Sequence, residues 1–327
     1  MKILVTGATG FLGTALVSRL CDRGDEVFCV AKDKLNLHDL EKLKVAKLVL
    51  SDLADDTSFG HMLKDIDVVF HLAGATRART FQEYYNSNVL ATKHFIDTCA
   101  RNATRLRRFV HISSIAAVGP STLENPLTEE SEFKPISEYG RTKMLGELEA
   151  LKAKDRLPTT IIRPSSVYGP RERDMYDMFR SVARGVYPVL GFTKKRVSAL
   201  HSDDFIEGLL SASEASRSLG ETYFLGSENY YTAEDIGEAI AKAMNRRPWN
   251  VRVPHSVLYA IGAAAQIGGK ISGKHVFMNI QKVRELVQPA WTCSVAKAQD
   301  HFGFRQKTSL EDGMAQTYRW YVENGWL

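Results

Sequence analysis

The sequence has few cysteines and no cluster of metal-binding residues. Its 327 residues include four cysteines, with no C-x-x-C spacing and no histidine pair beside them. Cys21, Cys29 and Cys99 lie in apolar segments, where we expect them to pack as small hydrophobic residues. Such cysteine usage is typical of a reducing compartment, so we expect a cytoplasmic protein without a metal site.

Long hydrophobic runs and blocks of one charge are also missing. The longest apolar stretch, residues 257–269, is interrupted by Gln266 and is too short to span a bilayer. We interpret it as a buried helix, with a hydrophobic lid or a membrane-surface contact as alternatives. The net charge is +5, but the basic clusters at 105–108, 194–196 and 246–247 are short and dispersed. They favour a solvated surface, so no nucleic-acid partner is expected.

Short apolar runs alternate with helical patterns through the first half of the chain. We expect strands at 2–5, 26–31, 48–50, 67–72, 109–112 and 159–162, and helices at 11–22, 55–63, 81–101 and 137–153. This alternation is typical of an α/β fold of the Rossmann type, a doubly wound parallel sheet with helices on both faces. Ligands bind such sheets beyond the carboxyl ends of the strands.

The alternation loosens after residue 165. We therefore expect a nucleotide-binding domain over residues 1–165, and mainly a smaller substrate lobe, interleaved with the last strands of the sheet, over 166–327. The least patterned segments are expected to line the substrate pocket, and they are residues 76–85, 120–135 and 171–200.

Three glycines mark the turn between the first strand and the first helix. Gly7 lets the chain turn sharply, Gly10 lets the backbone approach a pyrophosphate, and Gly13 lets the helix pack closely on the sheet. The helix N-terminus then offers free N–H groups and a positive dipole to phosphates. The spacing G-x-x-G-x-x-G between a strand and a helix therefore predicts a dinucleotide site.

Tyr139 and Lys143 lie four residues apart near the start of an expected helix, so they share one face. A free tyrosine titrates near pH ~10, and a base that works near neutrality needs a pKa about three units lower. We expect the Lys143 ammonium and a positively charged nicotinamide ring to lower it. Ser113 and Ser114 follow an expected strand and could bridge a substrate oxygen to the phenol. His71 and His111, each within an apolar strand, are interpreted as buried core histidines.

Several motifs occur together in the order of one family. They are T-G-x-x-G-x-x-G at 6–13, D-L at 52–53, H-L-A-G at 71–74, N-V-x-x-T at 88–92, I-S-S at 112–114, Y-x-x-x-K at 139–143 and R-P-x-x-V-Y-G-P at 163–170. With these motifs the sequence resembles, over almost its whole length, the extended short-chain dehydrogenases/reductases, also called the NAD-dependent epimerase/dehydratase family. The set is specific for fold and cofactor class and much less specific for substrate.

The resemblance implies roles for individual residues. Tyr139 would be the acid/base, Lys143 would hold the nicotinamide ribose, and Ser114 matches the catalytic serine better than Ser113 does. The residues implied to bind the cofactor, besides Tyr139 and Lys143, are Gly7, Thr9, Gly10, Phe11, Leu12, Gly13, Asp52, Leu53, Leu72, Ala73, Gly74, Asn88, Pro164, Ser166 and Val167.

Other positions bear on the substrate. Ser166 stands where many sugar-nucleotide enzymes of the family carry asparagine, and the segment around Ser114 is similar to the hydroxysteroid-dehydrogenase and dihydroflavonol-reductase branches. We therefore expect hydride transfer between NAD(P) and a secondary alcohol or ketone. One alternative is a nucleotide-sugar epimerase or dehydratase, in which the hydride transfer is transient. The other is a cofactor-binding sensor without turnover.

The end of the second expected strand favours NADP over NAD. NAD-specific sheets place an acidic residue there to bind the ribose 2′-hydroxyl, whereas this sequence has Ala31. Lys32 follows at once and Lys34 lies two residues further, so two ammonium groups could contact a 2′-phosphate. Asp33 is the alternative, since a shift of alignment would let it take the ribose role.

Two of the expected helices correspond to those that pair in dimers of many family members, and we therefore expect a homodimer. The apolar residues that support this expectation are Tyr84, Val89, Phe95 and Ile96 on 81–101, and Met144, Leu145 and Leu148 on 137–153.

Overall fold

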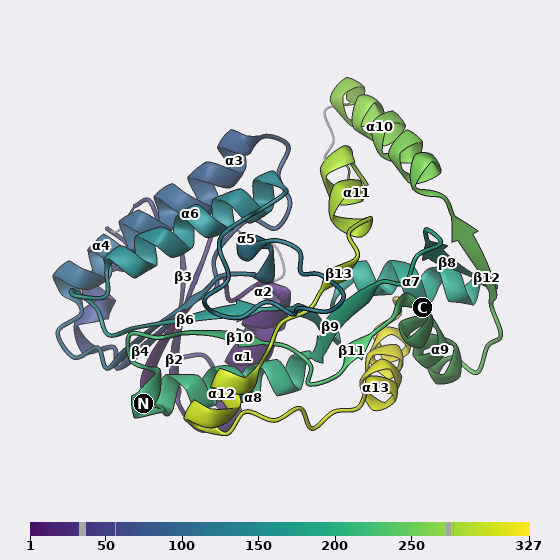
Figure 1. Ribbon diagram of the computed structural model, residues 1–327. Helices are drawn as coiled ribbons and strands as arrows, with labels where there is room; N and C mark the ends of the chain where they lie inside the picture. The colour runs from purple at the N-terminus through teal and green to yellow at the C-terminus, as the bar shows by residue number, and fades with distance from the viewer. Residues whose placement is uncertain (33–36, 56, 273–275, 277) are drawn as a thin grey trace.

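A seven-stranded parallel sheet forms the centre of the molecule (Figure 1). The computed structural model describes residues 1–32, 37–55, 57–272, 276 and 278–327. The sheet has the order β10-β6-β5-β4-β1-β2-β3, and every pairing in it is parallel. Its strands, in that order, are Thr222–Leu225, Thr159–Pro164, Arg108–Ile112, Val68–His71, Lys2–Thr6, Glu26–Ala31 and Lys47–Leu50. The expected Rossmann-type α/β fold is confirmed.

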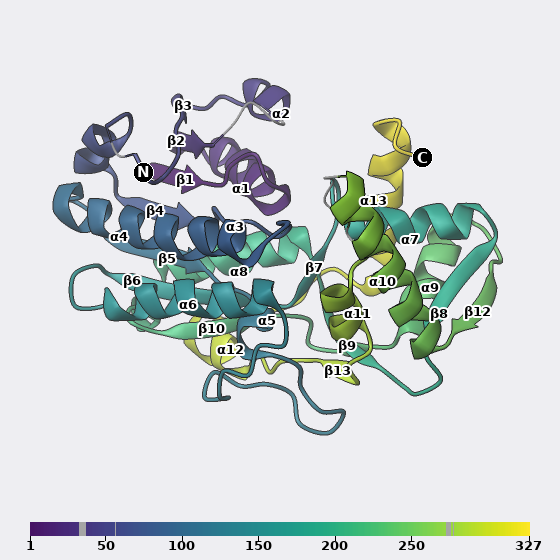
Figure 2. The ribbon, with the colours of Figure 1, turned by 90° about the horizontal axis from the view of Figure 1, so that it is seen from above.

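Helices cover both faces of this sheet (Figures 1 and 2). One face carries α1 (Phe11–Asp22), α2 (Leu37–Glu41), α8 (Ser202–Glu214) and α12 (Ala296–Phe302). The other carries η1 (Gly60–Asp65), α3 (Phe81–Tyr85), the π-helical turn η2 (Asn86–Leu90), α4 (Ala91–Asn102) and α6 (Glu138–Lys152), with α5 (Ile115–Val118) at its edge. Successive strand residues point to opposite faces, so Ile3 and Val5 join the first core and Leu4 the second.

The second half of the chain builds a lobe beside the carboxyl edge of the sheet. It contains β7 (Ser166–Tyr168), α7 (Arg173–Ala183), β8 (Val186–Leu190), β9 (Arg196–His201), β11 (Tyr230–Tyr231), α9 (Ala233–Ala243), β12 (Trp249–Val253), α10 (His255–Ser272), α11 (Ile280–Leu286), β13 (Ala290–Trp291) and α13 (Leu310–Glu323). Strand β9 pairs with β7, β11 and β13, and β8 pairs with β12. The lobe is interleaved with the first sheet, because α8, η3 (Ser216–Ser218), β10 and α12 return to it.

Helix α10 differs from the expectation of a buried helix for residues 257–269. Only one of its faces is covered: Leu258, Gly262 and Gly269 are buried, and Gly262 lies directly against Val283 of α11. Val257, Ile261 and Ile267 on the opposite face are exposed. The expectation was wrong because the helix projects from the lobe and has one partner helix instead of a surrounding core (Figure 1).

In the part of the chain that the structure describes, no helix combines the length and the apolar character that crossing a bilayer requires.

Candidate active site

A single large cleft runs along the carboxyl edge of the sheet and continues between the sheet and the lobe. Its volume is about 2450 Å³. All but one of the residues assigned to the site from the sequence and described here line this cleft, the exception being Asn88. The site therefore extends from β2, across the strand ends of β1, β4 and β5, to the lobe.

The glycine turn at β1 fits a dinucleotide pyrophosphate. Gly7 has φ of +70°, a conformation that favours glycine, and a Cβ on Gly13 would lie 2.1 Å from the Gly7 carbonyl oxygen. A Cβ on Gly10 would meet only the Gly7 oxygen, at 3.2 Å, so this position faces the cleft. Gly10 is also the N-cap of α1 and offers no capping side chain. The first amides of α1 are thus directed toward the place a phosphate would take.

The far end of the cleft holds an exposed ion pair. Lys32 Nζ lies 3.0 Å from Asp52 Oδ2, and their side chains are 71% and 46% exposed. Hydrogen bonds from the Ala54 backbone N–H and from Lys32 lower the pKa of Asp52. Strand β2 ends at the buried Ala31 and supplies no carboxylate there. Asp33 and Lys34, the other residues weighed for cofactor choice, lie outside the described residues.

Asn88 does not line the cleft but is hydrogen-bonded to Ala75, which does. Its Oδ1 accepts a hydrogen bond from the Ala75 backbone N–H at 2.7 Å, and its Nδ2 donates to the Ala75 oxygen at 3.1 Å and to Thr142 Oγ1 at 3.0 Å. It is buried in the π-helical turn, a rare geometry that is frequent at functional sites. These bonds hold the 72–75 segment against α6, and a contact between Asn88 and a cofactor stays a prediction.

The catalytic candidates converge at the carboxyl end of β5. Ser114 follows this strand, while Tyr139 and Lys143 lie in the first turns of α6, whose N-cap is Ser137. The Ser114 hydroxyl is hydrogen-bonded to the Tyr139 phenol, and Lys143 Nζ donates to the Ile112 carbonyl oxygen at 2.7 Å. Three groups suited to proton transfer and to holding a polar substrate therefore meet in one part of the cleft.

The charge state of this cluster differs from the sequence-based expectation. Burial, together with the nearby Glu285 carboxylate, raises the pKa of Tyr139 to about 12, although the bond to Ser114 opposes that shift. Burial lowers the pKa of Lys143 to about 8. In this structure burial dominates, and the Lys143 ammonium is directed at the Ile112 oxygen. The lowering of the Tyr139 pKa by Lys143 together with a nicotinamide ring stays a prediction. At neutral pH the phenol is protonated and suited to act as an acid.

A buried ion pair beneath the cluster was missed by the sequence reasoning. Arg163 donates to both carboxylate oxygens of Glu147 at 2.7–3.2 Å, and the side chains are 4% and 0% exposed. Ser113 donates its hydroxyl to the same carboxylate. Ser113 is thereby committed to the protein interior, and Ser114 alone of the two serines faces Tyr139. The signal in the sequence was Glu147 four residues after Lys143, on the same helix face.

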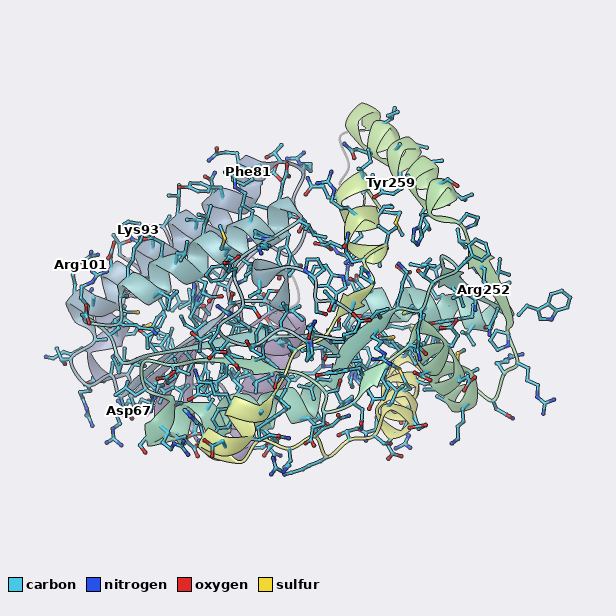
Figure 3. All side chains as sticks on the ribbon, in the orientation of Figure 1. Asp67, Phe81, Lys93, Arg101, Arg252 and Tyr259 are labelled. Carbon is cyan, nitrogen blue, oxygen red and sulfur yellow. The ribbon has the colours of Figure 1, made fainter. Side chains whose placement is uncertain are left out.

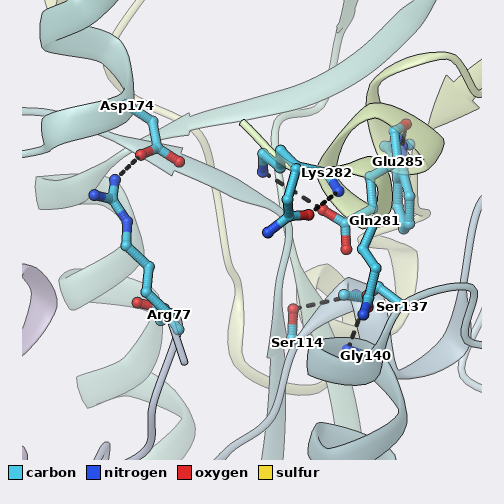
Figure 4. Close-up of polar contacts among 12 residues, drawn as sticks. Arg77, Ser114, Ser137, Gly140, Asp174, Gln281, Lys282 and Glu285 are labelled. Atoms are coloured by element: carbon cyan, nitrogen blue, oxygen red, sulfur yellow. Dashed lines mark hydrogen bonds and ion pairs between the residues drawn. The ribbon is translucent and has the colours of Figure 1, made fainter. Parts of the chain in front are cut away.

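Helix α11 of the lobe closes the substrate end of the cleft (Figure 4). Gln281 Oε1 accepts a hydrogen bond from the Glu138 backbone N–H at 2.7 Å, so α11 is attached to the start of the catalytic helix α6. Lys282 pairs with Glu285 at 3.5 Å. Arg77 and Asp174 form an ion pair across the same end of the cleft. The place of α11 was not anticipated, because nothing in the local sequence places 280–286 beside residue 138. Arg77 and Asp174 lie in two of the segments that were expected to line the substrate pocket.

The remaining expectations concern side chains that lie away from the cleft. His71 is buried and exchanges hydrogen bonds with Thr6 Oγ1 at 2.7 Å and with Thr92 Oγ1 at 3.1 Å, and burial lowers its pKa to about 3. Burial also lowers the pKa of His111. Both are core histidines, as expected. Within the described residues, no group of three or more histidine, cysteine or acidic side chains is placed to hold a metal ion.

Comparison with known proteins agrees with the Rossmann-type fold and with the family that the sequence motifs resemble. The model of the NAD-dependent epimerase/dehydratase family matches residues 3–226. A ceramide reductase of Caulobacter vibrioides is 29% identical over 99% of this chain and 96% of its own. A 2-alkyl-3-oxoalkanoate reductase of Stenotrophomonas maltophilia is 25% identical, over 96% of this chain and 97% of its own. The structure of a UDP-glucuronic acid 4-epimerase from Bacillus cereus in complex with NAD superposes with a TM-score of 0.80 at 23% identity, covering 99% of each chain.

Proposed function

Because the chain belongs to the NAD-dependent epimerase/dehydratase family, we propose that it is an oxidoreductase that reduces a ketone on a largely apolar molecule, or oxidises the matching secondary alcohol. The observation that carries the proposal is the bond between Ser114 and a protonated Tyr139, formed beside Lys143 at the end of β5. A nicotinamide bound along the glycine turn would exchange a hydride with the substrate carbon.

The residues of the chain would handle the substrate oxygen. Ser114 donates a hydrogen bond that holds the carbonyl oxygen beside the phenol. Tyr139 then transfers its proton to that oxygen as negative charge develops there. With its pKa raised to about 12, Tyr139 keeps this proton at neutral pH and can act as the acid in the reduction. Lys143, whose ammonium donates to the Ile112 carbonyl oxygen, would hold the nicotinamide ribose beside the phenol.

An apolar substrate is favoured because three cations of the substrate half are already bound to protein oxygens. Lys195 Nζ donates to the Leu286 carbonyl oxygen at 2.9 Å, and burial lowers its pKa to about 8. Arg196 donates to the Leu123 carbonyl oxygen at 3.2 Å, and Arg77 pairs with Asp174. Cations committed in this way are poorly suited to hold a diphosphate. The names of the two reductase relatives point to ketones carried on alkyl chains.

We further propose that the cofactor is NADP. Lys32 is exposed at the cleft next to the carboxyl end of β2, where Ala31 stands in place of the acidic residue of NAD-specific sheets. An ammonium in this position gives a charge-assisted contact to a 2′-phosphate. Its present partner Asp52 is itself exposed, so exchanging that partner for a phosphate costs little.

A homodimer through α4 and α6 is also part of the proposal. Of the apolar residues first assigned to it, Val89, Phe95 and Ile96 are buried in the protein and are not available to a partner. Met144, Leu145 and Leu148 on α6 are half-buried and remain accessible. Light scattering at micromolar concentration should give twice the chain mass, and a strictly monomeric mass would rule the dimer out.

The experiment that tests the function is a screen of ketones with the purified protein, followed by the loss of reduced-cofactor absorbance. We expect NADPH consumption with long-chain or sterol ketones. Conversion of a nucleotide sugar without net cofactor use would establish the epimerase or dehydratase alternative instead. Failure of every substrate class would favour the non-catalytic sensor.

The variant Tyr139→Phe separates chemistry from binding. It should lower turnover by ~10²–10⁴-fold while cofactor affinity stays nearly unchanged, because the ring still packs. Tyr84→Phe is the matched control, since the Tyr84 ring lies 6.1 Å from that of Tyr139 but its hydroxyl donates to the Thr76 carbonyl oxygen. Near-full activity of Tyr139→Phe would refute the assignment.

A further inference from the structure

Helix α10 exposes an apolar face that nothing in the described structure covers. Val257, Ile261 and Ile267 are 44%, 48% and 60% exposed, and Tyr259 is 39% exposed. The opposite face meets α11, so the exposed residues form the outer side of a two-helix hairpin. A surface helix normally turns charged residues outward, but residues 256–269 contain none.

Strand β12 continues this apolar surface. Trp249 is 80% exposed and Val251 is 44% exposed. The strand leads into α10 through Pro254, and both elements lie on the outer edge of the lobe, where Figure 3 labels Arg252 and Tyr259. Tryptophan and tyrosine side chains are enriched at membrane–water interfaces because their rings are apolar and their tips are polar.

The charge around this surface has one sign. Residues 239–284 contain eight lysines and arginines and no acidic residue. Lys242, Arg246 and Arg247, which precede β12, are exposed. Arg252 pairs with an acidic residue of α9, since its guanidinium lies 3.1 Å from Glu234. Exposed cations followed in the chain by exposed apolar residues complement a bilayer that carries anionic lipids.

We propose that α10 and β12 dock the protein onto the surface of an anionic membrane, with the apolar face of α10 in the headgroup region and the cations of 242–247 against the lipid phosphates. The helix would lie on the membrane without crossing it. The hairpin also forms a wall of the catalytic cleft, through Gln266 and Gly269 of α10 and Met278 before α11. Docking would therefore bring the substrate end of the cleft close to the bilayer.

The test is sedimentation of the purified protein with vesicles of phosphatidylcholine alone or mixed with phosphatidylglycerol. We expect binding to the mixed vesicles that weakens as salt is raised, and little binding to the neutral ones. The double variant Ile261→Asp/Ile267→Asp should bind the mixed vesicles at least about tenfold more weakly. Leu219→Asp, which replaces an exposed leucine away from the lobe hairpin, should bind like the wild type.

A second variant distinguishes a loss of membrane binding from a loss of folding. Arg246→Glu/Arg247→Glu leaves α10 untouched and should also lose binding by about tenfold or more, while its circular dichroism and melting temperature stay unchanged. Absence of wild-type binding to anionic vesicles would overturn the proposal, as would binding by both double variants that is as tight as that of the wild type. If Ile261→Asp/Ile267→Asp instead converts a dimer to a monomer and vesicle binding is absent, a second copy covers this face. None of these readouts depends on the proposed activity, so the docking can fail while the function stands.

Discussion

The two ends of the cleft hold their charged residues in opposite ways. Beneath the catalytic cluster, Glu147 and Arg163 are almost completely buried and joined by three hydrogen bonds. At the cofactor end, Lys32 and Asp52 form one contact in solvent. A buried pair must keep both partners because either one alone would be an uncompensated charge, whereas an exposed pair can change partners at little cost. The catalytic geometry is therefore fixed, while cofactor choice remains adjustable.

Breaking the buried pair should have the largest effect. Glu147→Gln leaves the Arg163 guanidinium buried without its carboxylate, and we expect a loss of roughly 3–5 kcal/mol in the free energy of unfolding. Denaturant titration measures it. The matched control is Glu149→Gln on the same helix, whose partner Lys152 is exposed, and this change should cost less than about 1 kcal/mol. Similar losses in both variants would contradict the contrast.

The neighbouring serines provide a sharper contrast, because one belongs to the buried network and the other to the cleft. Ser114→Ala should lower turnover by ~10²-fold with little change in stability. Ser113→Ala removes a donor to the Glu147 carboxylate and should cost about 1–3 kcal/mol of stability with a smaller effect on turnover. Steady-state kinetics and unfolding curves on both variants check this. A loss of turnover in Ser113→Ala together with a loss of stability in Ser114→Ala would contradict these assignments.

The buried ammonium of Lys143 makes stability depend on pH. Its pKa is about 8 in the folded protein and near ~10.4 in an unfolded chain. Between these values the unfolded chain holds a proton that the folded one has lost, so the free energy of unfolding rises with pH. The difference in the free energy of unfolding between the wild type and Lys143→Met should rise in favour of the wild type by on the order of 2 kcal/mol over this pH window. Below pH ~8 this difference should not change with pH.

The control for that measurement is Lys152→Met, which removes an exposed lysine from the same helix. It should follow the wild-type pH dependence throughout. If the free energy of unfolding depends on pH in the same way for the wild type and Lys143→Met, Lys143 is not desolvated in the folded protein.

The exposed pair at the cofactor end should give the smallest change in free energy. We expect the wild type to bind NADPH at least tenfold tighter than NADH, a difference of about 1.4 kcal/mol. Lys32→Glu should remove this preference and leave the melting temperature within a few degrees of wild type. Fluorescence titration with both cofactors decides it. Equal wild-type affinities, or tighter binding of NADH, would instead point to Asp33 as the ribose ligand.

Much of the site could be predicted because its signals are local. The glycine turn needs particular residues at Gly7 and Gly13, where the backbone leaves no room for a side chain, so the requirement appears directly in the sequence. Tyr139 and Lys143 share a helix face by spacing alone. Ser114 was preferred over Ser113 by alignment to the family, and the structure places Ser114 beside the phenol and Ser113 against Glu147.

Other features depend on residues far apart in the chain. Glu147 and Arg163 belong to different elements and meet only when α6 packs on β6. The attachment of Gln281 to the backbone of Glu138 joins residues 143 positions apart. The direction of the Tyr139 pKa shift also depended on such contacts, because burial and Glu285 outweigh the lysine one turn away. Neither spacing nor composition reports how deeply a side chain is desolvated.

The Rossmann-type sheet and the glycine turn could be read from the sequence alone, because each follows from steric or periodic requirements within a few residues. The Ser114, Tyr139 and Lys143 set was predicted from helix spacing and from the resemblance to the family. Only the tertiary structure decided that Asn88 works from behind the cleft, that α10 is exposed instead of buried, and that a buried ion pair supports the catalytic helix. The physical reason is that burial is a property of the assembled surfaces. An apolar run such as 257–269 carries the same pattern whether a core or the solvent lies beside it.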